Sequence, residues 1–114
     1  MRARIYHNPR CSKSRATLAL LTERAGDLHV VDYLATPLSR AKLRELSDKL
    51  GQPTISLVRT DEPEFRAHAA RTLSDDEIFD LLVEHPRLLQ RPIVELGDRA
   101  RIGRPPERVL ELFE

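Results

Sequence analysis

YHNPRCSKSR, residues 6–15, is the stretch that decides the fold, and it contains the single cysteine of the chain, Cys11. The residues before it, Ala3–Tyr6, have the character of a short β-strand. The residues after it, from Ser14 to about Ala25, predict an amphipathic helix, with apolar residues at helical spacing at Leu18, Leu21 and Ala25. A strand, a turn and a helix in this order place the cysteine sulfur at the N-terminus of a helix.

A cysteine at a helix N-terminus is a candidate nucleophile. Free backbone N–H groups and the positive end of the helix dipole favour its thiolate form. Four nearby side chains add positive charge: Arg10, Lys13, Arg15 and His7. Such a thiolate could attack an electrophile while the amides hold an oxyanion beside it. A second cysteine at position 14 would make a dithiol redox site, but the residue there is Ser14, so the site is monothiol.

The length and composition predict one domain, residues 1–114, that works in the cytoplasm. A single cysteine excludes an internal disulfide and favours a reducing compartment. No apolar run approaches the roughly 18 residues of a membrane span, and Met1–Arg4 does not resemble a signal peptide. The net charge of +1 gives no field that would favour nucleic acid or a membrane as partner, and we expect a monomer.

The rest of the chain predicts a strand, a helical block, a hairpin and a last helix. Leu28–Tyr33 is expected to form a strand parallel to the first. Ser39 is a helix cap for residues 40–50, which Gly51 ends, and Ser74–Glu77 is a capping box before a helix that ends near His85. Short helical turns are expected between these two helices, over residues 52–71. Three segments follow: a strand at Pro92–Leu96, a two-residue turn with a strand at Arg99–Ile102, and a helix at Glu107–Phe113.

This order of elements predicts the fold class. Two parallel strands and a terminal hairpin make a mixed four-stranded α/β sheet of the thioredoxin-like kind. A helical insertion, about residues 38–88, separates its two halves.

Four sequence segments together resemble the glutaredoxin-dependent arsenate reductase family. The segments are Tyr6–Arg15, Tyr33–Pro37 (YLATP), Arg91–Val94 (RPIV) and Arg101–Glu107 (RIGRPPE). The combination of an early His-Asn-Pro-x-Cys with a late Arg-Pro-Ile-Val is specific, whereas either motif alone is weak. The resemblance covers about residues 4–112.

The resemblance implies the fold, the reaction and the site residues. The fold would be thioredoxin-like, and the reaction would reduce arsenate to arsenite, with glutathione as co-substrate and glutaredoxin as partner, in arsenic detoxification. The family's roles fall on six residues of this chain: the nucleophile on Cys11, the thiolate-assisting histidine on His7, the oxyanion-binding arginines on Arg59, Arg91 and Arg104, and a cis proline on Pro92.

The residue types fit this chemistry. Arsenate is a tetrahedral, phosphate-like anion, so its site needs positive charge, several N–H donors and a soft nucleophile. We expect no bound cofactor, because no dinucleotide fingerprint occurs, and no metal, because a His7/Cys11 pair has no further ligands nearby.

Two alternatives remain open. One is a glutathione-dependent thiol reductase of unknown substrate, whose arginines bind the glutathione carboxylates. The other is a non-catalytic regulator that binds RNA polymerase, as some relatives of this fold do. Ser14 counts against the regulator, because such proteins resemble a Cys-x-x-Cys switch.

Overall fold

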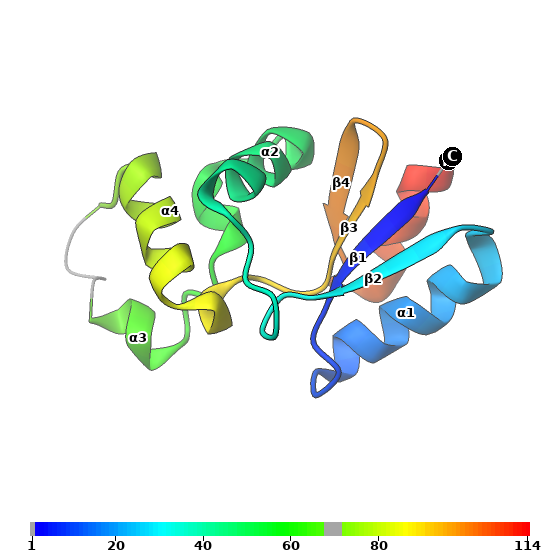
Figure 1. Ribbon diagram of the computed structural model, residues 1–114, viewed down its shortest axis with the longest axis horizontal. Coiled ribbons are helices and arrows are strands. Elements are labelled where there is room, and N and C mark those ends of the chain that lie inside the picture. Colours follow the sequence, from blue (N-terminus) through cyan, green and yellow to red (C-terminus); the bar gives the residue numbers. More distant parts are fainter. Residues whose placement is uncertain (1, 68–71) are drawn as a thin grey trace. The chain divides into compact units, whose positions relative to one another are not determined.

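The structure is a computed structural model that describes residues 2–67 and 72–114. The chain divides into two compact units, residues 1–36 with 91–114 and residues 37–90. The elements of the first unit are β1 (Ala3–His7), α1 (Ser12–Arg24), β2 (Leu28–Asp32), β3 (Ile93–Leu96), β4 (Arg99–Ile102) and the 3₁₀-helix η3 (Pro106–Phe113) (Figure 1). Those of the second are α2 (Arg40–Leu50), the 3₁₀-helix η1 (Thr54–Leu57), α3 (Pro63–Arg66), α4 (Asp75–Glu84) and the 3₁₀-helix η2 (Pro86–Leu88).

The first unit is built on a mixed four-stranded sheet with the strand order β2-β1-β3-β4, which confirms the predicted fold class. Strand β1 pairs in parallel with β2 and antiparallel with β3, and β3 pairs antiparallel with β4. The central strand therefore comes from the N-terminal part of the chain. Its carboxyl end leads directly into the turn that carries Cys11 (Figure 1).

Successive side chains along each strand point to opposite faces of the sheet, and both faces carry buried residues. Ile5 of β1 and its partner Val94 of β3 point to one face, where α1 and η3 pack on them. Leu21 of α1 and two residues of η3, Val109 and Leu112, complete that core. On the opposite face, Tyr6 donates its hydroxyl proton to Glu95, with 2.7 Å between the two oxygens.

The second unit, residues 37–90, is helical, and its centre is the pair α2 and α4. Helix α2 begins at the Ser39 cap, whose hydroxyl accepts the Lys42 N–H, and ends at Gly51, which is left-handed (φ 66°) as the C-cap requires. Phe79 of α4 lies under the guanidinium groups of Arg40 and Arg44, at 5.8 and 5.1 Å from ring centre to guanidinium carbon. The one-domain organisation predicted from the sequence stays a prediction.

Local signals placed most elements correctly, with two corrections. Helix α1 begins at Ser12 rather than Ser14, because Cys11 is its N-cap. The last segment is a 3₁₀-helix, and it buries Val109 and Leu112. These two residues are three positions apart, the repeat of a 3₁₀-helix. Short helical turns occur at η1 and α3 as expected, whereas residues 68–71 of that stretch lie outside the described residues.

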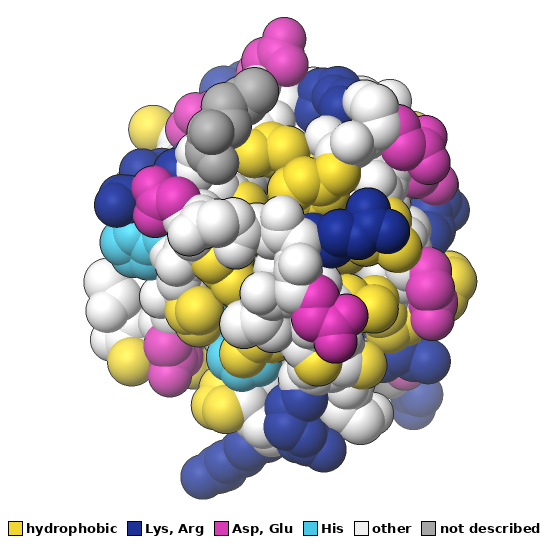
Figure 2. All heavy atoms as spheres, turned by 90° about the vertical axis from the view of Figure 1, so that its right-hand side faces the viewer, with side chains coloured by type: hydrophobic (Ala, Val, Ile, Leu, Met, Phe, Trp, Pro, Cys, Tyr) yellow, Lys and Arg dark blue, Asp and Glu magenta, His cyan; other side chains and the backbone are white. Residues whose placement is uncertain are grey.

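No helix in the described ranges combines the length and the apolar character needed to cross a membrane. Acidic and basic side chains are both scattered among apolar ones over the face of the molecule in Figure 2. This distribution agrees with the net charge of +1.

The capping box of α4 gives a prediction for stability. The Ser74 hydroxyl accepts the Glu77 N–H at 3.2 Å, and the Glu77 carboxylate accepts the Ser74 N–H at 3.0 Å. Ser74→Ala removes one of these bonds and should lower the free energy of unfolding by about 1 kcal/mol. Denaturant unfolding followed by circular dichroism measures the change. Ser74→Asp keeps an acceptor and should retain most of the stability, so equal losses in both variants would contradict the capping role.

Candidate active site

The turn before α1 fixes the position of Cys11. Asn8 and Cys11 close a β-turn, in which the Cys11 N–H donates to the Asn8 carbonyl at 3.0 Å. The sequence suits this turn, because Pro9 holds the second position and the Asn8 side chain accepts the Arg10 N–H at 3.0 Å. Cys11 itself has extended backbone angles (φ −96°, ψ 124°) and is the N-cap of α1. The thiol therefore lies at the helix start, where the sequence predicted it, and it is partly exposed.

The surroundings of Cys11 lower the pKa of its thiol below the ordinary value. Burial acts against this by disfavouring the thiolate, but the backbone N–H groups of Ser14 and Lys13 stabilise the negative charge. Arg91 adds both charge attraction and a side-chain hydrogen bond. The net result is a thiol that ionises more readily than a free cysteine, as expected for a nucleophile.

Arg91 and Arg104 both reach the sulfur from the C-terminal part of the chain. Arg104 Nη2 lies 3.6 Å from Cys11 Sγ, although the two residues are 93 positions apart. Arg104 Nε donates to the Arg91 carbonyl at 2.8 Å, so the backbone of one arginine holds the side chain of the other. The structure thus brings together three of the predicted site residues: the nucleophile and two arginines.

The guanidinium of Arg91 is the most unusual group at this site. Its Nε and Nη1 atoms are buried and have no hydrogen-bond partner among the described residues. A buried donor without a partner is costly, and a charged one more so. These two atoms lie on a group that already interacts with the thiolate of Cys11. The arrangement therefore offers open donor capacity for an anion beside the nucleophile.

His7 forms its hydrogen bond with the side chain of Ser14. Its Nδ1 lies 2.8 Å from the Ser14 hydroxyl, which also accepts the Asn8 N–H at 3.0 Å. Burial lowers the pKa of His7, Asp32 raises it and Arg15 lowers it, and the net pKa lies below the ordinary value. A neutral ring can accept the hydroxyl proton at Nδ1. His7 and Ser14 therefore brace the turn that carries the cysteine, and the thiolate-assisting role of His7 stays a prediction.

Ser14 and Gly103 are the structural contributors that the sequence reasoning missed. Ser14 is fully buried, and its hydroxyl joins the end of β1 to the first turn of α1. Its position three residues after Cys11 was the available signal, but it indicated only the missing second thiol. Gly103, next to Arg104, packs against α1 so closely that no side chain fits there.

Arg91 and Arg104 each precede a proline through a cis peptide bond, Arg91–Pro92 and Arg104–Pro105. The cis bond expected at Pro92 is confirmed. The Gly103 N–H donates to the Pro92 carbonyl at 2.9 Å, so the two arginine-bearing segments are also joined through their backbones.

Arg59 belongs to the second unit, where it is an ion-pair partner. Its Nη1 lies 2.5 Å from Glu62 Oε1, and both side chains are largely buried, with exposed fractions of 20% and 15%. The other carboxylate oxygen of Glu62 lies 3.6 Å from Arg87 Nη2. The Arg59 N–H donates to the Leu88 carbonyl at 2.8 Å, which fixes its backbone. Its role in binding an oxyanion stays a prediction.

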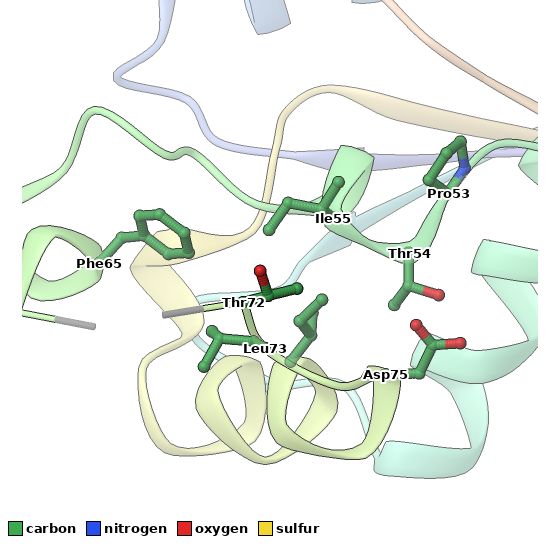
Figure 3. Close-up of a pocket in the computed structure, with 8 residues that line it drawn as sticks. Pro53, Thr54, Ile55, Phe65, Thr72, Leu73 and Asp75 are labelled. Atoms are coloured by element: carbon green, nitrogen blue, oxygen red, sulfur yellow. The ribbon is translucent and has the colours of Figure 1, made fainter. Parts of the chain in front are cut away.

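The described residues contain no group of three or more His, Cys, Asp or Glu side chains that could hold a metal ion. A pocket of about 330 Å³ lies within residues 37–90 and is mainly apolar (Figure 3). Its walls come from η1, α3 and the start of α4: Pro53, Thr54, Ile55, Phe65, Thr72, Leu73, Asp75 and Ile78. None of the six predicted site residues is among them.

The environment of Cys11 predicts how its reactivity depends on pH. Because the pKa of the thiol is lowered, the thiolate persists to lower pH than in a free cysteine. The rate of alkylation by iodoacetamide should therefore reach half of its maximum below the ordinary thiol pKa of roughly 8.5. The same chain in urea is the control and should titrate near the ordinary value. Equal midpoints for the folded and unfolded chain would remove the basis for a nucleophilic Cys11.

Comparison with known proteins identifies the family of this chain. The family model described as the ArsC family matches residues 6–112. A relative from Escherichia coli (strain K12), the uncharacterized protein YfgD, is 46% identical, over 96% of this chain and 94% of the relative. An arsenate reductase of Haemophilus influenzae is 42% identical, over 96% and 97%. A solved structure of an arsenate reductase from Vibrio cholerae has a TM-score of 0.92 and 43% identity, and covers 98% of both chains. The match spans the cysteine turn and both arginine segments, and the chain belongs to the ArsC family.

Proposed function

We propose that the protein is an arsenate reductase in which the thiolate of Cys11 attacks arsenate and glutathione and a glutaredoxin complete the reduction. The observation that carries the proposal is the guanidinium of Arg91. Two of its buried nitrogens have no partner, while the same group stabilises the thiolate. An oxyanion beside the sulfur would satisfy those nitrogens. The similarity to proteins named arsenate reductase supports arsenate as that oxyanion.

The arginines suit a tetrahedral anion because a guanidinium can donate two parallel hydrogen bonds to one edge of it. Arg91 comes just before β3 and Arg104 just after β4, so both arginines lie at the open end of the hairpin that these strands form. Arg59 would be the third arginine, and to bind an anion it has to exchange part of its pairing with Glu62. His7 would assist the thiolate through Ser14, by holding the N–H groups of the first turn in place.

The reaction balances with one protein thiol and one external thiol. The Cys11 thiolate forms a bond to arsenic(V), and an arsenate oxygen leaves as water after taking up protons. The glutathione thiolate then attacks the Cys11 sulfur of the adduct and forms a disulfide with it. The electron pair of the S–As bond stays on arsenic, which leaves as arsenite. A glutaredoxin thiolate then attacks the glutathione sulfur of the mixed disulfide, so that glutathione passes to glutaredoxin as a new disulfide and Cys11 leaves as the thiolate.

The single cysteine also suggests where the protein works. Catalysis requires Cys11 to be reduced, and the external thiols that this mechanism uses are abundant in the cytoplasm. We infer a cytoplasmic enzyme that acts as a monomer, with no bound cofactor.

Measuring how tightly an oxyanion binds tests the roles of Arg91 and Arg104 without the need for catalytic turnover. Arsenate, phosphate or sulfate should protect Cys11 from alkylation. Arg91→Ala and Arg104→Ala should each weaken that protection by roughly 1.5–3 kcal/mol, or about 10- to 150-fold in affinity, because a charge-assisted hydrogen bond is lost. Arg10→Ala is the matched control, because Arg10 is an exposed cation one residue from Cys11. Equal effects of all three substitutions would mean that general charge, not a built site, holds the anion.

Assays with different external thiols as the source of electrons test the mechanism. The reduced protein alone should not release arsenite catalytically, because Cys11 supplies one of the two thiols that the reduction needs. With arsenate, glutathione and glutaredoxin, turnover should be sustained, and mass spectrometry without glutaredoxin should find one glutathione on Cys11. Thioredoxin should serve less well, because no intramolecular disulfide forms.

Cys11→Ser is the control and should abolish turnover with an unchanged circular dichroism spectrum. Sustained turnover with thioredoxin alone, without a glutathione adduct, would overturn the mechanism. If oxidised glutathione forms a mixed disulfide with Cys11 while arsenate neither protects the thiol nor turns over, the protein is instead a thiol reductase of another substrate.

A further inference from the structure

Gly103 occupies the tightest contact near the site. A methyl group added at its Cα would lie 2.6 Å from the Thr17 hydroxyl oxygen and 2.8 Å from the Pro92 ring carbon Cγ. Both distances are far below the contact distance of carbon with oxygen or carbon. Residue 103 therefore has to be glycine for reasons of space. Its backbone does not need glycine, because its φ is not in the left-handed region that Gly51 and Gly97 adopt.

The neighbours of Gly103 have little freedom to move away. Thr17 is fully buried on the inner face of α1, in line with Ser14 and Leu21. It is β-branched, so its side chain has few allowed rotamers in a helix. Its hydroxyl is buried without a hydrogen-bond partner among the described residues. A threonine held in this way indicates that close packing, rather than hydrogen bonding, decides its position.

Three segments that carry the reactive groups meet at this contact. Thr17 lies on the helix whose N-cap is Cys11. Pro92 follows Arg91, and its carbonyl accepts the Gly103 N–H at 2.9 Å. Gly103 itself precedes Arg104, whose Nη2 lies 3.6 Å from the sulfur. The separation of α1 from residue 103 therefore sets how far the Arg104 guanidinium lies from the thiolate.

We propose that Gly103 is a positioning residue that, by its contact with Thr17, keeps Arg104 within reach of the Cys11 sulfur and of a bound oxyanion. The proposal rests on the proposed anion site of Arg91 and Arg104. A side chain at position 103 pushes the Arg104 segment away from α1. The thiolate then loses a cationic neighbour, and the anion loses a donor.

The test compares Gly103→Ala with Gly26→Ala. Gly26 is the matched control, because an added methyl there meets nothing within 4 Å and its φ is not left-handed. Two readouts are measured for each: thiolate absorbance of Cys11 against pH, and protection of Cys11 from alkylation by phosphate. Gly103→Ala should raise the pKa of the thiol, because the Arg104 guanidinium no longer lies at the sulfur, and should weaken phosphate protection about tenfold or more, in the same direction as expected for Arg104→Ala. Gly26→Ala should match the wild type in both.

A second substitution separates positioning from loss of the fold. Thr17→Ala removes two of the three atoms that a methyl at 103 would meet, Oγ1 and Cγ2, and leaves the Pro92 ring carbon Cγ. The double variant Thr17→Ala/Gly103→Ala should recover part of the phosphate protection and of the lowered pKa that Gly103→Ala alone loses. Circular dichroism of each variant shows whether it is folded, so that loss of the site is distinguished from loss of the fold. The proposal is wrong if the double variant shows no recovery, or if Gly103→Ala is folded and behaves as the wild type.

Failure of this inference differs from failure of the proposed function. If phosphate and arsenate do not protect wild-type Cys11, the anion site is wrong, and the pKa readout alone decides about Gly103. If phosphate and arsenate protect the wild type and Gly103→Ala equally well, the proposed anion site is supported and the positioning role of Gly103 is wrong.

Discussion

A negative charge on the Cys11 sulfur is the requirement on which the rest of this site depends. Burial of the sulfur opposes that charge, and only groups from several parts of the chain outweigh the opposition. The N–H groups of Lys13 and Ser14 come from the first turn of α1, and the guanidinium groups come from residues 91 and 104. The sheet is what brings these parts together, because β1 delivers the cysteine turn and β3 begins directly after Arg91 and Pro92.

The three arginines differ in how much donor capacity they keep. Arg59 is paired closely with Glu62, so its charge is already compensated within its own unit. Arg104 uses Nε on the Arg91 carbonyl and Nη2 on the sulfur. Arg91 alone among them has two buried nitrogens without a partner among the described residues. An incoming anion would therefore find the most unused donors on Arg91, whereas two nitrogens of Arg104 already lie at the Arg91 carbonyl and the sulfur.

The parts of the structure that follow from local sequence were predictable. The Ser39 cap, the Gly51 stop and the Ser74 capping box each depend on residues a few positions apart, and the structure confirms all three. The burial of polar Ser14 and Thr17 was not predictable, because hydrophobic periodicity assigns apolar residues to the inner face of a helix. Only the resemblance placed Arg91 and Arg104 at the cysteine, since packing across 93 positions leaves no local pattern. The same reasoning assigned Arg59, and that role stays a prediction.

The central place of β1 has a consequence for the growing chain on the ribosome. The strand has β2 on one side and β3 on the other, so its backbone hydrogen bonds are complete only after residues 93–96 have emerged. Residues 37–90 form a contiguous unit and can fold earlier. Until residues 91–104 arrive, Cys11 is translated but lacks its arginine neighbours. Cys11 is thus translated well before the arginines that help to stabilise its thiolate, and this part of its activation comes only with residues 91–104.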